Sequence, residues 1–258
     1  MNTIEIDVYR LSLYYLVLII PFSIILWLRL PMVKETLLAV VRMTLQLTFV
    51  GLYLQVVFKL NNPFINALWL CALILVADLS VLRSCKIGIL RCLIPIALAI
   101  LVGLSLPLLV LLKVTLGLSN PMDARFLIPI GGMILGNCMR ASIIGIRDFF
   151  SRVKKEEKTF LLALGQGATL FEAVRPFIRE AFKASIMPTV ATMATIGLVS
   201  LPGMMTGVIL GGQDPAYAIR YQIAIMIAIL SGTALTVVLA IIFSLKVNFT
   251  PFGIYRSR

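Results

Sequence analysis

The 258-residue chain contains no histidine, and only 11 of its residues are acidic. The absence of imidazole excludes every mechanism that needs a histidine base or a histidine metal ligand. Charged residues make up only 13% of the chain and apolar residues 60%, which excludes a disordered chain. No Gly-Lys pair occurs, so the phosphate-binding loop G-x-x-x-x-G-K is missing and any ATP must be bound by another chain.

Cysteine is scarce, and its spacing indicates neither a zinc site nor a disulfide framework. None of the four cysteines belongs to a C-x-x-C pair, and we interpret all of them as small apolar residues: Cys71, Cys85, Cys92 and Cys138. The first apolar run follows Glu5 and Asp7 and lacks a basic start, so we expect a retained span and no cleaved signal peptide.

Apolar residues dominate the chain, and its mean hydropathy is +1.05. Soluble globular chains are about 45–50% apolar, so the composition is typical of a polytopic membrane protein. The net charge of +12 is spread between long apolar runs and forms no basic patch, which excludes a nucleic-acid-binding domain. Continuously apolar runs of about 20 residues predict membrane-spanning α-helices and exclude barrel strands. We predict an all-α bundle, one transmembrane domain over residues 1–258, with about seven spans: 8–28, 37–58, 63–82, 93–112, 126–146, 186–210 and 221–245.

The distribution of lysine and arginine predicts the orientation. If the N-terminus is outside, the inner segments hold sixteen basic residues and the outer segments hold five. Because basic residues are enriched in cytoplasmic loops, we predict that the N-terminus lies outside and the C-terminus inside.

Residues 147–185 form the one substantial segment between spans, and we expect them to lie in the cytoplasm. A short helix is predicted before Gly165, and Gly165-Gln166-Gly167 is typical of a turn. Thr169 and Glu172 match the S/T-x-x-E capping box, so a new helix should begin at about Leu170. Pro176 predicts that this helix is short and that a second, amphipathic helix starts at the proline.

A short capped helix on the cytoplasmic face is suited to contact with a partner protein. Phe171 and Val174 are the candidate side chains for a partner's groove. The alternative is an interfacial helix that only anchors the chain to anionic lipid. The residues alone leave these two interpretations open.

The segment ALGQGATLFEA (163–173) resembles the coupling loop of ABC transporter permeases. The stretches GGMILGNCMRAS (131–142) and SLPGMMTGVILGGQDPAYAIRYQ (200–222) are similar to the FetB family of these permeases, associated with bacterial iron export and with plant relatives linked to aluminium tolerance. The resemblance implies a homodimeric permease that works with a separate ATP-binding subunit and needs no cofactor of its own. It implies contact with the ATPase through Ala163, Gly165, Ala168, Glu172 and Ala173, to which the cap adds Thr169 and Phe171.

The pattern G-M-x-x-G occurs at 132–136 and again at 203–207. Small residues four apart let transmembrane helices approach closely, so packing alone explains this pattern as well as a functional role does. Pro202 bends a helix and frees a carbonyl, as in broken helices that line polar paths. We therefore predict that the translocation path includes Met133, Asn137, Pro202, Met204 and Met205. The methionines are soft metal ligands or plain core residues, and the sequence assigns no metal site.

Few ionisable residues lie within the spans. Arg42 and Asp78 fall at the predicted inner ends of their helices, and Gln46 lies one turn beyond Arg42. Snorkelling to the interface or pairing with each other are the structural interpretations of Arg42 and Asp78. A polar inner gate that includes Gln46 is the functional one, because an intramembrane charge is a functional hypothesis by default. The other candidate carboxylates, Asp123 and Asp214, fall in predicted outer loops.

The leading hypothesis is an ABC permease subunit of the bacterial inner membrane that exports iron or a related metal species. The same architecture carrying a nucleotide sugar or another solute is the runner-up. An ATP-independent channel or secondary carrier is a third possibility. A membrane enzyme is disfavoured, because the chain has no histidine and no cluster of carboxylates.

Overall fold

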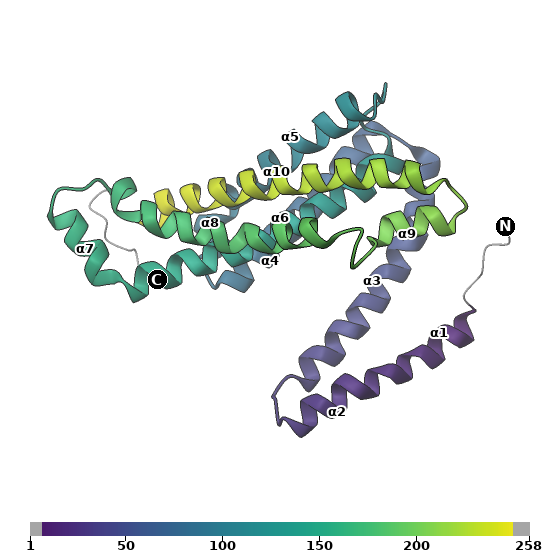
Figure 1. Ribbon diagram of the computed structural model, residues 1–258, viewed down its shortest axis with the longest axis horizontal. Helices are drawn as coiled ribbons and strands as arrows, with labels where there is room; N and C mark the ends of the chain where they lie inside the picture. Colours follow the sequence, from purple (N-terminus) through teal and green to yellow (C-terminus); the bar gives the residue numbers. More distant parts are fainter. Residues whose placement is uncertain (1–6, 250–258) are drawn as a thin grey trace. The chain divides into compact units, whose positions relative to one another are not determined.

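The computed structural model describes residues 7–249, and within that range it is almost entirely helical, with no strand (Figure 1). The chain divides into two compact units, one with the helices before residue 61 and the other with nearly all of the chain after it. The expected all-α polytopic architecture is confirmed. A single permease domain over residues 1–258 stays a prediction.

The first unit contains a helical hairpin. Arg29, with a left-handed backbone (φ 52°), lies in its turn. The elements before this turn follow one another without interruption and form the apolar segment Val8–Trp27. The unit consists of α1 (Val8–Tyr14), the 3-10 helix η1 (Tyr15–Leu18), α2 (Ile19–Trp27) and α3 (Val33–Leu60).

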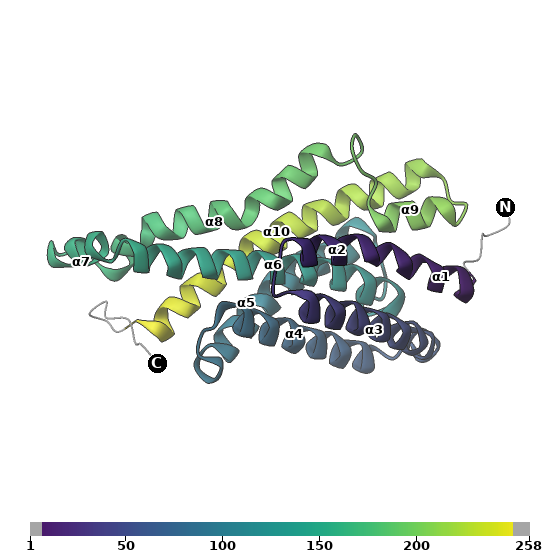
Figure 2. The ribbon, with the colours of Figure 1, turned by 90° about the horizontal axis from the view of Figure 1, so that it is seen from below.

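The second unit is a helical bundle. In it α10 packs along α5 and α6, and α6 packs against α4 and α8 (Figures 1 and 2). Its apolar core contains fully buried leucine and isoleucine side chains such as Leu82, Ile100, Leu104 and Ile134. The elements are α4 (Pro63–Cys85), α5 (Ile89–Val110), the π-helix η2 (Leu111–Thr115), α6 (Ala124–Lys155), α7 (Glu157–Gly165), α8 (Leu170–Thr195), α9 (Gly203–Leu210) and α10 (Pro215–Asn248).

Helices α4, α6 and α10 each begin at an asparagine or aspartate cap. The side chains of Asn62, Asp123 and Asp214 accept hydrogen bonds of 2.9–3.0 Å from backbone N–H groups two residues later, at the starts of α4, α6 and α10. Pro63 and Pro215 occupy the first helical position, where no N–H is needed. The carboxylates of Asp123 and Asp214 are therefore occupied as helix caps.

Six helical segments of the described chain are long and apolar enough to cross a membrane, and they match six of the seven expected spans: Val8–Trp27, Val33–Leu60, Pro63–Cys85, Leu90–Thr115, Ala124–Lys155 and Pro215–Asn248. The remaining expected span, 186–210, was wrong as a continuous helix. It contains the end of α8, an irregular stretch over 196–202, and α9. The chain leaves the helix there because Gly197 has a positive φ of 86° and Pro202 has no N–H to donate.

The expected helix boundary at Pro176 was also wrong. Helix α8 is continuous through both Pro176 and Pro188. Both prolines lie on the exposed side of α8. The buried residues repeat at helical spacing across the first proline: Ala173, Val174, Phe177, Ala181 and Ser185. Burial of this stripe against the bundle offsets the hydrogen bond that a proline removes.

A close backbone approach in the bundle joins α5 and α10. A Cβ atom on Gly103 would lie 2.9 Å from the Thr236 backbone nitrogen, and one on Gly232 would lie 2.9 Å from the Gly103 carbonyl oxygen. By contrast, no neighbouring atom lies within 4 Å of a Cβ built on Gly132, Gly136, Gly203 or Gly207. Within this chain the repeated G-M-x-x-G pattern therefore does not mark close helix packing.

Candidate functional site

A cavity of about 560 Å³ lies in the second unit between α6, α8, α10 and the irregular stretch before α9. Figures 1 and 2 show these three helices running side by side. Four of the residues predicted for the translocation path line the cavity: Met133, Asn137, Pro202 and Met204. The structure thus brings together two stretches of sequence that were selected separately.

The remaining predicted path residues lie elsewhere. Met205 is buried and lines two smaller cavities, of about 250 and 410 Å³. Arg42 and Gln46 are on α3 of the first unit, whereas Asp78 is on α4 of the second. The side chain of Asp78 is fully buried, and neither carboxylate oxygen has a hydrogen-bond partner among residues 7–249. The polar inner gate stays a prediction.

Arg140 brings a positive charge to the wall of the 560 Å³ cavity. Its Nη2 donates to the Asn137 Oδ1 at 3.2 Å, and its Nε donates to the Gly136 carbonyl at 3.4 Å. The Asn137 Nδ2 in turn donates to the Met133 carbonyl at 2.8 Å. Because these residues are three or four apart on α6, they share one face of the helix and hold the guanidinium at the cavity.

Our selection of path residues from the sequence did not include Arg140 or Gln222. Arg140 carries a usable signal, because it is an arginine inside a span with Asn137 three residues before it. Gln222 is buried near the start of α10 and lines all three cavities. Only the folded bundle identifies it, since a single glutamine at the end of an apolar run has no distinctive spacing.

The capping box predicted at the start of α8 is confirmed. The Thr169 hydroxyl and backbone N–H donate to the Glu172 carboxylate at 2.7 and 2.8 Å, and the Glu172 N–H donates back to the Thr169 hydroxyl at 3.3 Å. These two hydrogen bonds to the carboxylate, the one from the hydroxyl above all, lower the pKa of Glu172. The predicted turn is also present, between α7 and α8, where Gly167 has a φ of 94°.

The residues expected to contact a partner differ in their exposure. Phe171 has 56% of its surface exposed, although it is a large aromatic side chain. Ala173 and Val174 are buried against the bundle, so the expectation that Val174 enters a partner's groove was wrong. At the turn itself Gly165 is exposed, and Ala163 and Ala168 are half-buried.

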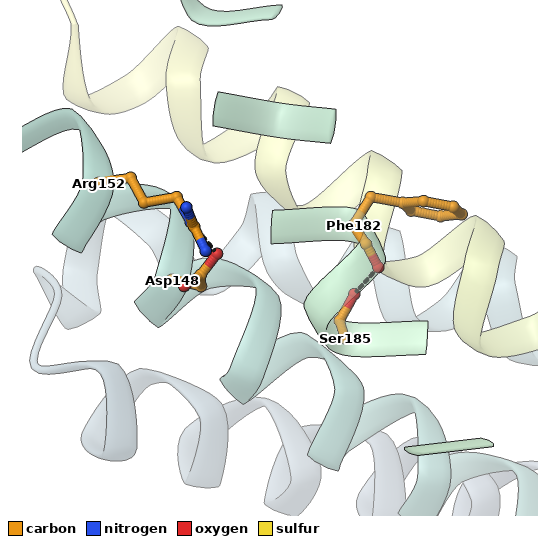
Figure 3. A network of polar contacts seen from close by, with 4 residues as sticks. All are labelled: Asp148, Arg152, Phe182 and Ser185. Carbon is orange, nitrogen blue, oxygen red and sulfur yellow. Dashed lines mark hydrogen bonds and ion pairs between the residues drawn. The ribbon is translucent and has the colours of Figure 1, made fainter. Parts of the chain in front are cut away.

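Figure 3 shows two polar contacts within residues 147–185, one on α6 and one on α8. Asp148 and Arg152, one turn apart on α6, form an ion pair of 2.6 Å. On α8 the buried Ser185 hydroxyl donates to the Phe182 carbonyl at 2.8 Å. A Cβ on Gly145 would lie 3.5 Å from the Ser185 side chain, so small residues keep α6 and α8 close at this level.

No group of three or more Cys, Asp or Glu side chains that could hold a metal ion occurs among residues 7–249. The cavity supplies three thioethers, from Met133, Met204 and Met226, together with amide and hydroxyl groups. Thioethers bind soft ions, whereas hard ions require oxygen ligands. The described residues therefore identify no resident metal centre.

Known proteins resemble this chain over most of its length. A relative from Bacillus subtilis (strain 168), "UPF0014 membrane protein YjkA", is 32% identical over 84% of this chain and 85% of its own length. The "Probable iron export permease protein FetB" of Escherichia coli (strain K12) is 34% identical over 82% of this chain and 80% of its own. "Protein ALUMINUM SENSITIVE 3" of Arabidopsis thaliana is 34% identical over 74% of this chain and 69% of its own.

No solved structure matches the chain. The family described as "Uncharacterised protein family (UPF0014)" matches residues 8–249, which include the cavity, the capping box and every described span. The similarity to a bacterial iron export permease and to the plant protein agrees with the resemblance expected from the motifs. This chain belongs to the UPF0014 family of membrane proteins.

Proposed function

We propose that the chain is the membrane permease subunit of an ABC transporter that exports iron or a related metal species. In this proposal a homodimer spans the bacterial inner membrane with residues 147–185 in the cytoplasm. A separate ATP-binding subunit hydrolyses ATP and docks on that segment. The similarity to a protein named as a probable iron export permease supports the assignment of cargo and direction.

The observation that carries this proposal is the exposed Phe171 beside a capped helix start. Exposed aromatic side chains are common anchors in protein interfaces because they bury a large area at a small cost in conformational entropy. The hydrogen bonds between Thr169 and Glu172 fix the direction in which the first turn of α8 presents Phe171. A partner would therefore meet a defined surface.

The continuity of α8 supports a mechanical connection between this docking surface and the cavity. Helix α8 begins at Leu170, and its later residues Thr189 and Thr192 line the 560 Å³ cavity. With a rise of 1.5 Å per residue, Leu170 and Thr189 are roughly 28 Å apart along the helix axis. Because a continuous helix moves as one element, a displacement at Phe171 reaches the cavity wall.

The test is reconstitution with a candidate ATP-binding subunit, sought among the genes that neighbour the gene for this chain. We expect the two chains to co-purify and ATP hydrolysis to rise on assembly. Phe171→Ala should weaken docking by about tenfold or more, as loss of an aromatic anchor does. Leu198→Ala removes an even more exposed apolar side chain from the loop after α8 and should leave docking unchanged.

Three outcomes would contradict parts of the proposal. Transport by the purified chain alone in vesicles would indicate a channel or secondary carrier. Unchanged intracellular iron after deletion of the gene, together with ATPase stimulation in the reconstituted complex, would indicate a nucleotide sugar or another solute as cargo. Equal docking of Phe171→Ala and the unaltered chain would reject the assigned contact surface.

A further inference from the structure

The 560 Å³ cavity has one charged group in its wall, the guanidinium of Arg140. A guanidinium carries five N–H donors, and the hydrogen bonds to Asn137 and Gly136 involve two of its nitrogens. The remaining N–H groups, on a side chain that lines the cavity, are available to a ligand. The Arg140 side chain is exposed in this chain and lies within the span expected over 126–146, where an arginine without an anionic partner is costly.

No side chain among residues 7–249 supplies that anion. Within residues 7–249 the one ion pair joins Asp148 and Arg152, and Arg140 takes no part in it. The residues that line the cavity include no aspartate, glutamate or cysteine. The positive charge of the cavity is therefore not neutralised from within the part of the chain that the structure describes.

The other polar groups of the cavity add hydrogen-bond donors. Thr189, Ser200 and Gln222 line it, and their side chains make no hydrogen bond within the described residues. Two further hydroxyls, those of Ser185 and Thr192, already donate to backbone carbonyls of α8. Free donors around an unpaired guanidinium favour a ligand rich in oxygen acceptors.

A bare metal cation fits this cavity poorly. A hard cation requires several oxygen ligands, usually with carboxylates among them, and the wall offers amide and hydroxyl oxygens but no carboxylate. Three methionine sulfurs could bind a soft cation, but the guanidinium in the same cavity would repel it. The volume of about 560 Å³ matches cavities that hold small organic molecules, which range over about 300–1,000 Å³.

We propose that this cavity binds an anion through carboxylate or phosphate oxygens at Arg140. The identity of the cargo rests on the proposed function. If the cargo is a metal, it would pass as an anionic chelate with an oxygen-rich ligand, and not as a free cation. The planar guanidinium suits two parallel hydrogen bonds to a carboxylate or phosphate group. Asn137 is a positioning residue, because its amide oxygen holds the Arg140 side chain in place.

The test measures equilibrium binding to the purified full chain in lipid nanodiscs, without any ATPase. The probes are ferric citrate, citrate alone, inorganic phosphate, and ferrous chloride under argon. We expect saturable binding of ferric citrate or phosphate, and competition between the probes separates a carboxylate ligand from a phosphate one. Ferrous ion alone should not bind saturably.

Substitutions of Arg140 test whether its positive charge favours the bound probe. Arg140→Gln should weaken anion binding tenfold or more, whereas Arg140→Lys, which keeps the charge, should retain part of the affinity. Arg83→Gln removes an exposed arginine from the end of α4, away from the cavity lining, and should leave binding unchanged. Melting temperatures of all variants verify folding.

The inference is overturned if none of the anionic probes binds, or if Arg83→Gln weakens binding as much as Arg140→Gln does. It is also overturned if ferrous ion binds saturably and Arg140→Gln strengthens that binding, since removal of a positive charge helps a cation. If anions bind at Arg140 but the chain stimulates no ATPase, the ABC assignment is rejected and the inference stands. If the chain exports its cargo with ATP but binds no anion, the inference is rejected and the ABC assignment stands.

Discussion

Gly103 of α5 lies directly against Thr236 of α10, so that a Cβ atom on Gly103 would be 2.9 Å from the Thr236 backbone nitrogen. Thr236 is fully buried, and its hydroxyl donates to the Gly232 carbonyl at 2.7 Å. The backbone atom cannot move aside as a flexible side chain would. Gly103 therefore sets the distance between two long helices of the bundle.

Gly103→Ala should lower the free energy of unfolding by about 1–3 kcal/mol, because overpacking forces the two helices apart. Thermal unfolding in detergent measures the effect. The matched control is Gly132→Ala on α6, where no atom lies within 4 Å of the added Cβ. That control should be neutral or gain up to about 1 kcal/mol from helix propensity. Equal melting temperatures for the two variants would contradict the packing argument.

Asp78→Val should raise the free energy of unfolding by about 1–3 kcal/mol, because it removes a buried carboxyl group with no hydrogen-bond partner in the described residues. Asp78→Asn keeps a polar group in the same place and should give no such gain. Denaturant titration of the two variants compares them. Destabilisation by Asp78→Val would instead indicate that the carboxyl group is paired, with Arg42 as the partner to test by a double-mutant cycle.

The capping box predicts a pH dependence at the start of α8. Hydrogen bonds from Thr169 hold the pKa of Glu172 below its ordinary value of 4.5. Because the folded pKa is the lower one, the carboxylate stabilises the helix start fully above about pH 4.5, and this contribution is lost as the pH falls through the lowered pKa. Hydrogen exchange of the amides in the first turn of α8, corrected for intrinsic rates, should show this loss of protection.

Glu172→Gln should flatten that pH profile, since its amide does not titrate in this range. Thr169→Ala should reduce protection at every pH, at a cost of about 1 kcal/mol for a lost N-cap. An unchanged acid-induced loss of protection in Glu172→Gln would assign the effect to another group.

The predicted orientation can be measured with single cysteines in a chain without its native cysteines. Lys158→Cys on α7 should react with a membrane-impermeant maleimide only from the cytoplasmic side, because the basic segment 147–185 is retained there. Ser119→Cys, exposed in the loop before α6, should react only from the opposite side. Reversed labelling would reject the orientation and, with it, docking of a cytoplasmic ATPase.

Local patterns in the sequence predicted the elements whose causes are local. The capping box of Thr169 and Glu172 and the turn before it depend on residues within a few positions of each other, and both are present. Six apolar runs lie in helical segments, several of them longer than the expected spans, because hydropathy locates a span but not the ends of its helix. Pro176 misled the prediction, since its local preference was outweighed by a stripe of side chains that α8 buries against the bundle.

The lining of the 560 Å³ cavity was predicted only in part. Met133, Asn137, Pro202 and Met204 were selected from unusual motifs, and they do line one cavity. Gln222 and the contact between Gly103 and Thr236 were missed, because no spacing within a single helix shows which residue faces another helix. The G-M-x-x-G pattern suggested close packing at glycines that have open space beside them.

Composition and periodicity by themselves established a polytopic helical membrane protein with a capped helix in its longest basic segment. Both follow from interactions with solvent, with lipid and with near neighbours in the chain. Only the tertiary structure joined α6, α8 and α10 around a cavity with an unpaired guanidinium, and only it made α8 one helix from Phe171 to that cavity. Such features depend on contacts between residues far apart in the sequence, which form when the helices pack.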